Sequence, residues 1–212
     1  MRIVIALALA ASLAACGKTE IREVDLDLIR IVGDARMRTD TVGEPKFATV
    51  ASFVLVDAEN ASETGAYVTL AGAFTDAAGL ELGPLKPQSL WVPAKGVRTF
   101  ALIDDARVPR PTATSAKIEV RGARIASPPR AQIVDLRVLD DRDKVVVQAT
   151  LVNESNRFGS VAVLAAFHDR DGRPMTRPHY VINIGPKRRH NVQFVGPRGS
   201  VRGTIYVGDE MY

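Results

Sequence analysis

Short runs of alternating apolar and polar residues recur along most of the chain. In the first run, Val24, Leu26 and Leu28 fall on one side and Asp25 and Asp27 on the other. Alternation of this kind is typical of a β-strand with one buried face. Similar runs predict strands at 53–56, 67–74, 90–92, 99–103 and 118–120, and again at 133–139, 145–152, 161–167, 180–184, 192–195 and 204–207.

Turn-forming residues separate these predicted strands. Residues 76–79 (Asp-Ala-Ala-Gly), 93–96 (Pro-Ala-Lys-Gly), 169–172 (Asp-Arg-Asp-Gly) and 196–199 (Gly-Pro-Arg-Gly) all favour tight turns. No segment combines sustained helical periodicity with capping residues. The pattern therefore predicts an all-β chain built of antiparallel β-sandwiches.

The chain divides at residues 126–130 (Ala-Ser-Pro-Pro-Arg), where paired prolines interrupt the strand pattern. Residues 60–93 align with 153–186 without a gap, in the order Asn-x-Ser turn, apolar strand, Phe-x-Asp-x-x-Gly. This order indicates a shared strand-turn-strand unit. We expect two domains, 23–126 and 132–212, joined by a linker at 127–131. The identities are Asn60/Asn153, Ser62/Ser155, Val68/Val161, Ala73/Ala166, Phe74/Phe167, Asp76/Asp169, Gly79/Gly172 and Pro93/Pro186.

The repeated unit resembles the small immunoglobulin-like modules of bacterial envelope proteins called FxLYD domains. Those modules have an Asn-containing turn, a β-strand, and an aromatic residue followed by Asp and Gly. The similarity is strongest over 145–175 and weaker over 53–82. The chain departs from the family pattern at Thr75 and His168, where the family often has Tyr. The resemblance implies two tandem immunoglobulin- or fibronectin-like sandwiches, and it implies little about function.

The amino-terminal residues differ from the rest of the chain. Arg2 is followed by an uncharged apolar stretch that ends in small residues before Cys16. This pattern predicts a secretory signal, too short to span a bilayer of about 30 Å. The alternative is an ordinary amino-terminal strand or helix.

The sequence Leu13-Ala14-Ala15-Cys16, followed by Gly17, resembles the lipobox of bacterial lipoproteins. The resemblance implies cleavage of a signal peptide at 1–15, a diacylglycerol and a fatty acyl chain on Cys16, and a lipidated tether at 16–22. Gly17 in place of Asp implies the outer rather than the inner membrane, with the protein facing the periplasm. An unmodified spare thiol at Cys16 is the alternative.

Composition limits the partners. Lys and Arg number 28 against 24 for Asp and Glu, an excess too small to predict a nucleic-acid binder. Cys16 is the only cysteine, so no disulfide within the chain is expected. No cofactor is predicted beyond the covalent lipid.

No catalytic or metal-binding set is predicted either. A nucleophilic hydrolase would need a Gly-x-Ser-x-Gly elbow or a free cysteine, and the chain offers neither. His168, His179 and His190 lack the spacing of metal ligands, and alternation from the expected core residue Phe167 directs His168 outward. His190 is expected in a turn.

Three further features have ordinary structural interpretations. Residues 169–172 resemble the opening of a calcium loop, but residue 180 is Tyr where a bidentate Glu is required, so a hairpin turn is expected. The acidic segment 140–143 is expected to be a charged connection rather than a calcium site. Trp91 aligns with Ile184, which favours a core position over a sugar-stacking one.

Positive charge gathers in the second half of the chain. Residues 128–212 hold 13 Lys and Arg against 9 Asp and Glu, whereas residues 16–127 hold 14 against 15. The pattern predicts an anionic partner such as lipopolysaccharide phosphate, peptidoglycan carboxylates or an acidic protein face. A solvated turn that protects a sheet edge is the alternative. The basic cluster comprises Lys187, Arg188, Arg189 and His190, in the turn expected to match residues 94–97, and Arg170, Arg173 and Arg177 on a connection expected to be its neighbour.

The segment from Gly33 to Lys46 is expected to be a long connection between the first two strands, either a functional rim loop or a tolerated insertion. The leading hypothesis is a non-enzymatic lipoprotein, anchored to a membrane, that binds or scaffolds an envelope protein of an assembly or transport system. A binding module for anionic glycans or lipids is the second hypothesis. An enzymatic role depends on a convergent polar cleft beside residues 33–46.

Overall fold

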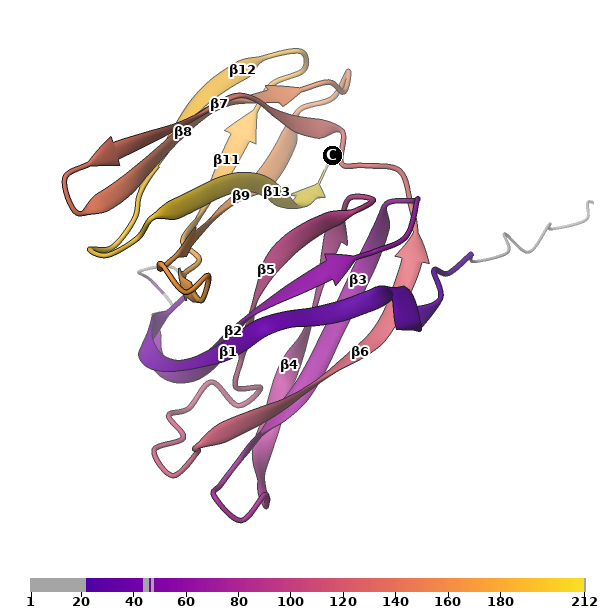
Figure 1. Ribbon diagram of the computed structural model, residues 1–212. Helices are drawn as coiled ribbons and strands as arrows, with labels where there is room; N and C mark the ends of the chain where they lie inside the picture. Colours follow the sequence, from indigo (N-terminus) through magenta and orange to yellow (C-terminus); the bar gives the residue numbers. More distant parts are fainter. Residues whose placement is uncertain (1–21, 44–45, 47, 212) are drawn as a thin grey trace, which may run out of the picture.

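The computed structural model describes residues 22–43, 46 and 48–211. The predicted signal peptide and Cys16 lie outside the described residues. The described chain forms two antiparallel β-sandwiches in tandem, as the strand pattern predicted (Figure 1). We call residues 22–125 domain 1 and residues 131–211 domain 2.

Domain 1 consists of two three-stranded sheets. One has the order β1-β2-β5 and the other β4-β3-β6, and all neighbouring strands are antiparallel. The elements are a short 3-10 helix η1 (Leu26–Leu28), β1 (Ile29–Val42), β2 (Thr49–Asn60), β3 (Ala66–Thr75), β4 (Glu81–Val92), β5 (Gly96–Ile103) and β6 (Ser115–Ile125).

Domain 2 repeats this topology. One sheet has the order β12-β8-β7, and in the other β9 pairs with β10, β11 and β13. Strands β10 and β11 together take the place of β4, and β13 takes the place of β6. The elements are β7 (Ala131–Asp141), β8 (Lys144–Asn153), β9 (Gly159–His168), β10 (Pro174–Thr176), β11 (His179–Ile184), β12 (Arg189–Val195) and β13 (Arg202–Met211).

The two domains share the same turn after their second strand. The buried Asn60 side chain donates to Thr64 O and Val92 O and accepts from Ser62 N. Asn153 donates to Arg157 O and Ile184 O and accepts from Ser155 N. The repeat found in the sequence is therefore a repeated set of hydrogen bonds.

The hairpins after β3 and β9 match in the same way. Asp76 Oδ1 accepts from the backbone N–H groups two and four residues later, and so does Asp169 Oδ1. Gly79 and Gly172 have φ of +80° and +76°, a conformation that suits glycine. Residues 169–172 thus form the hairpin turn that was expected.

Two expectations for the start of domain 1 are wrong. Residues 24–28 are not a strand: Asp25 accepts from Asp27 N, a turn of 3-10 helix follows, and Leu26 and Leu28 are exposed. The segment 33–46 is not mainly a loop, because β1 continues to Val42. Its polar sequence hid the strand, since β1 is an edge strand, largely solvent-exposed, with a bulge between Val32 and Arg36.

Each domain has its own hydrophobic core, and domain 2 also contributes to the core of domain 1. Residues Val161, Val163, Ala165 and Phe167 of β9 belong to the core of domain 2. Leu164 and Ala166, on the other face of β9, pack with Tyr206 into the core of domain 1. Burial on both faces explains why β9 is nearly continuously apolar.

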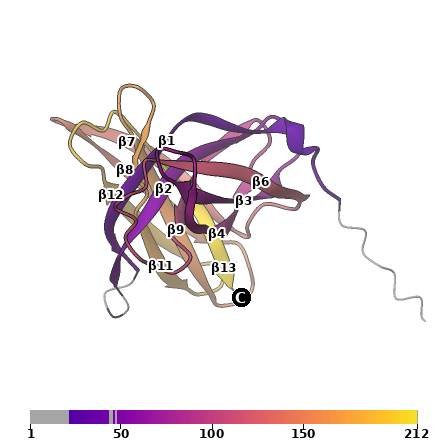
Figure 2. The same cartoon turned by 90° about the horizontal axis from the view of Figure 1, so that it is seen from below.

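The chain enters domain 1 on the side away from domain 2. Residues 22–24 run beside the end of β6, where Val24 N donates to Ala123 O and Ile125 N donates to Arg22 O, and η1 lies on the side of domain 1 opposite β7, β8 and β12 in Figure 2. Within the described part of the chain, no helix has the length and apolar character needed to cross a membrane.

Candidate functional site at the domain junction

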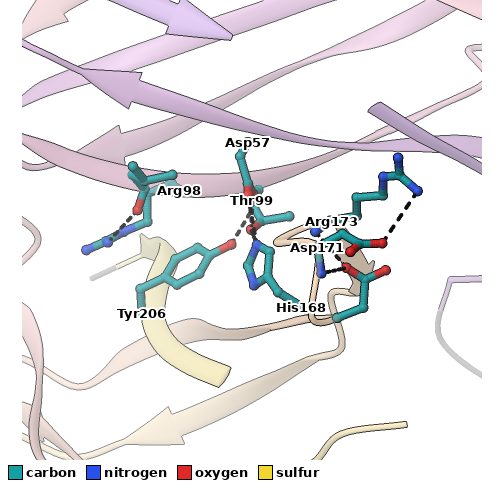
Figure 3. Close-up of polar contacts among 9 residues, drawn as sticks. Asp57, Arg98, Thr99, His168, Asp171, Arg173 and Tyr206 are labelled. Carbon is teal, nitrogen blue, oxygen red and sulfur yellow. Dashed lines mark hydrogen bonds and ion pairs between the residues drawn. The ribbon is translucent and has the colours of Figure 1, made fainter. Parts of the chain in front are cut away.

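The outer face of β9 and β13 carries polar groups onto domain 1. His168 at the end of β9 points toward Asp57 of β2 and Thr99 of β5, and Tyr206 of β13 lies beside them (Figure 3). His168 is only 5% exposed, so the expectation that it is solvated is wrong. Alternation did direct it away from the core of domain 2, but domain 1 covers that face.

Asp57, Thr99 and His168 form a buried hydrogen-bond network. His168 Nε2 lies 2.8 Å from Asp57 Oδ2, and Thr99 Oγ1 donates to Asp57 Oδ1 at 2.5 Å. A proton on Nε2 therefore donates to the carboxylate. The network joins two strands of domain 1 to one strand of domain 2.

These three residue types match those of a nucleophilic triad, but their geometry does not. In a triad, the acid and the hydroxyl bond to opposite nitrogens of the imidazole. Here the carboxylate occupies Nε2, Thr99 Oγ1 lies 3.5 Å from that same nitrogen, and Nδ1 is enclosed without a partner. The arrangement holds the domains together and leaves the hydroxyl bonded to the acid.

Tyr206 is the second polar anchor of the junction. Its hydroxyl donates to Thr99 O at 2.6 Å, and burial raises the pKa of the Tyr206 hydroxyl. The guanidinium carbon of Arg98 lies 4.8 Å from the centre of the Tyr206 ring. Burial lowers the pKa of the guanidinium groups of Arg98 and Arg177, both of which interact with Tyr206.

Salt bridges tie the β9–β10 hairpin to β1. Arg173 pairs with Asp34 at 3.0 Å, Arg36 with Asp169 at 3.6 Å, and Arg38 donates to Met175 O at 2.8 Å. The segment expected to be a free loop is thus part of the junction.

A cleft of about 420 Å³ with both polar and apolar walls lies beside Gly33, where the enzymatic hypothesis required a polar one. Its lining includes Asp57, Thr99 and His168, together with Glu59 and Arg202. The Thr99 hydroxyl is bonded to the carboxylate rather than to a free imidazole nitrogen, so the cleft lacks a nucleophile hydrogen-bonded to its base. This geometry gives no support to catalysis there.

The predicted basic cluster is divided between the two ends of domain 2. Lys187, Arg188, Arg189 and His190 follow Ile184, which pairs with Gly159 at the start of β9. Arg170 and Arg173 follow His168 at the end of β9, about 30 Å away for a ten-residue strand. The two connections are therefore not neighbours.

Three of these seven basic residues have acidic partners, and one of them is Arg173, which pairs with Asp34. Arg189 pairs with Asp135 at 3.1 Å and Lys187 lies 3.9 Å from Glu154. Arg177 is partly buried at the junction, with Nε and Nη1 enclosed and without a partner. Arg170 and Arg188 are exposed, and His190 is exposed within β12 rather than in a turn.

The turn that carries Lys187 matches its counterpart in domain 1 with a shift of one residue. Lys95 and Lys187 both have φ of 54°, and both donate to a backbone carbonyl, of Ala61 and Glu154 respectively. The shift arises before the turn, because Val92 faces Ala66 whereas Ile184 faces Gly159, so residues 187–190 do not match 94–97 position by position.

Trp91 lies at the junction rather than in the core. Its side chain is partly exposed, and Nε1 donates to Ala126 O of the linker at 3.2 Å. The aligned Ile184 is buried in domain 2. The ungapped alignment is one residue out of register here, because Trp91 faces Tyr67 as Asn183 faces Ser160, and the structural counterpart of Ile184 is the buried Val92.

The acidic segment after β7 is a hairpin connection, as expected. Asp141 lies 3.5 Å from Lys144 and Asp143 lies 3.4 Å from Arg198. Among residues 22–43, 46 and 48–211, no three His, Cys, Asp or Glu side chains are grouped so that they could hold a metal ion.

Strand β7 exposes apolar side chains at a sheet edge. It pairs with β8 on one side only, and Val138 and Leu139 are 50% and 44% exposed. An edge of this kind offers unpaired backbone groups together with apolar contacts. Alternation in the sequence detected the strand but gave no sign that this part of it is uncovered.

Comparison with models of known protein families finds no match, and comparison with curated protein sequences finds none either.

Proposed function

We propose that the chain is a lipid-anchored, non-enzymatic envelope protein that holds domain 2 away from a membrane so that it can bind a protein partner. The exposed apolar edge of β7 carries this proposal. Val138 and Leu139 lie on domain 2, about 25 Å along β7 from the linker that leaves domain 1. A partner strand added to β7 would bury these side chains and pair the free backbone groups.

The junction supports a scaffolding role. The hydrogen bonds of Asp57, Thr99, His168 and Tyr206, and the packing of β9 against domain 1, oppose bending between the domains. A scaffold that holds its binding domain at a constant distance from the membrane needs a junction that resists bending.

Capture of partners from solubilised envelopes tests the proposal. The lipidated protein is expected to enrich a protein that a variant carrying Val138→Lys and Leu139→Lys does not enrich. Val50→Lys is the matched control, because Val50 is similarly exposed but lies on domain 1. Equal recovery with all three proteins would contradict the assignment to β7.

The anchor is tested separately at Cys16. We expect Cys16→Ser to release the protein from membranes after cell fractionation, because one amino-terminal lipid group supplies the attachment. Membrane association that persists in Cys16→Ser would contradict a lipid anchor.

The second candidate function is binding of an anionic glycan or lipid by domain 2. A polar cleft of about 470 Å³ on the outer face of β7, β8 and β12, lined by Gln148, Thr150, Asn191 and Gln193, favours it. The test is salt-dependent binding to lipopolysaccharide or peptidoglycan. Retained binding after Lys187, Arg188 and Arg189 are changed to Ser would exclude the basic turn from this role.

A further inference from the structure

A second groove lies on the linker side of the junction and has mainly apolar walls. Trp91 from β4, Pro128 and Pro129 from the linker, Leu136 from β7 and Tyr206 from β13 line it. Its volume is about 400 Å³, within the range of small-molecule sites. This groove is separate from the cleft beside Gly33. It does not include Val138 or Leu139 of β7.

The charged group in this groove is the guanidinium of Arg98. Arg98 lines the groove, stacks on the Tyr206 ring and donates from Nη1 to Val97 O at 2.9 Å. Its Nε is enclosed without a partner. Arg177, the other cation that interacts with Tyr206, likewise has no carboxylate partner among the described residues.

Such an arrangement calls for a negative partner. Arg98 is half-buried, and a guanidinium partly withdrawn from water normally pairs with a carboxylate, because a charge that has lost part of its hydration is unfavourable without a counter-ion. At this junction, two guanidinium groups flank a tyrosine that burial keeps in its neutral form. The groove therefore combines an apolar wall with an uncompensated positive charge.

We propose that this groove binds a small amphiphilic anion, with its carboxylate or phosphate at Arg98 and its apolar chain against Trp91, the two prolines and Leu136. A guanidinium accepts either acid group through paired hydrogen bonds. The aromatic ring and the prolines offer flat apolar surface to a hydrocarbon chain. The proposal goes beyond the proposed scaffolding function and does not rest on it.

Trp91 makes the test direct, because it is the only tryptophan of the chain. The full chain carrying Cys16→Ser is used, so that neither detergent nor an attached acyl chain competes for the groove. Trp91 emission is followed during titration with dodecanoate, dodecyl phosphate, dodecanol, acetate and inorganic phosphate. The two anionic amphiphiles are kept below their critical micelle concentrations, and dodecanol is kept below its solubility limit. We expect saturable changes with dodecanoate or dodecyl phosphate, and at least tenfold weaker binding of the alcohol and of the two small anions.

Variants assign the binding to Arg98. Arg98→Gln is expected to weaken binding of the anionic probe about tenfold or more, whereas Arg121→Gln, an exposed arginine of β6 paired with Glu119, leaves it unchanged. Leu136→Glu places a carboxylate at an exposed position of the groove and is expected to abolish binding even if Arg98→Gln does not fold.

Preference for dodecanoate over dodecyl phosphate would identify a fatty acid as the ligand type, and the reverse would identify a phospholipid-like one. The absence of saturable binding by either anion, equal binding of dodecanol, or unchanged binding in Leu136→Glu would overturn the proposal. Any of these results would leave the partner capture through β7 unaffected.

Discussion

At the scale of single residues, two buried asparagines hold the equivalent turns of the two domains. Asn153 satisfies backbone groups of Ser155, Arg157 and Ile184 that would otherwise be buried without partners. Asn60 does the same in domain 1. A short amide side chain that offers both donors and an acceptor is needed for this role.

We therefore expect Asn153→Ala to lower the free energy of unfolding by about 2–3 kcal/mol, because several buried backbone groups lose their partners. Urea denaturation measures the change. Asn191→Ala is the control, since Asn191 is exposed and accepts only a 3.3 Å hydrogen bond from Thr150, and its cost should stay within about 0.5 kcal/mol. Similar losses in both variants would refute this role for Asn153.

Tyr206 gives the junction a dependence on alkaline pH. Burial raises the pKa of its hydroxyl, so the folded state retains a proton that the unfolded state loses near its ordinary pKa of about 10. Its contribution to stability is complete below that pH and declines as the pH rises further, by at most about 1.4 kcal/mol per pH unit. Burial also raises the pKa of the Tyr67 hydroxyl, so both tyrosines contribute to the loss of wild-type stability at alkaline pH.

Unfolding free energies measured between pH 9 and 11 test this point. Tyr206→Phe is expected to be less stable than wild type at neutral pH by about 1–2 kcal/mol, since the hydrogen bond to Thr99 O is lost. Its stability should fall less steeply with pH. The exposed Tyr180→Phe should keep the wild-type slope. An unchanged slope in Tyr206→Phe would show that its hydroxyl is not buried in the folded state.

At the scale of elements, the β3–β6 pairing depends on a close backbone approach. A β-carbon added to Gly72 of β3 would lie 2.1 Å from Lys117 O of β6. A β-carbon added to Gly122 of β6 would have no other atom within 4 Å. The close approach of the two backbones therefore requires glycine at position 72 but not at position 122.

Gly72→Ala is expected to lower the free energy of unfolding by about 1–3 kcal/mol, because the strands must move apart. Gly122→Ala should be tolerated within about 0.5 kcal/mol. Thermal and urea unfolding of both variants measure the difference. If the two alanines behave alike, β3 and β6 do not approach as closely as described.

At the scale of the whole molecule, the buried hydrogen bond between Asp57 and His168 couples the two sandwiches. It joins residues 111 positions apart in the sequence and is nearly excluded from solvent. Asp57→Ala leaves Nε2 of His168 and Oγ1 of Thr99 buried without their acceptor, so it is expected to be destabilising by about 2–4 kcal/mol.

A double-mutant cycle measures the coupling itself. With Asp57→Ala, His168→Ala and the double variant, we expect an interaction free energy of about 1–3 kcal/mol. The exposed pair Glu119 and Arg121 serves as the control, with an expected coupling below about 1 kcal/mol. No measurable coupling between Asp57 and His168 would mean that the domains are held by other contacts.

Local sequence patterns predicted most of this fold. Alternation located eleven of the strands, and the Asn-x-Ser and Phe-x-Asp-x-x-Gly patterns located the turns that repeat between the domains. Those patterns succeed because a strand with one face on its own core must alternate, and because a turn needs particular side chains within a few residues. The lipobox at Cys16 is a local pattern too, and it stays a prediction.

The tertiary structure alone decided where the domains meet. No local pattern distinguishes an outward side chain in water from an outward side chain under another domain, so His168 was placed on the surface although domain 1 covers it. The polar edge strand β1 was hidden for a different reason: it is largely exposed and bulged, so burial imposes no alternation on its sequence. Burial between domains depends on contacts across a hundred residues, whereas sequence periodicity records only the burial of a strand within its own sandwich.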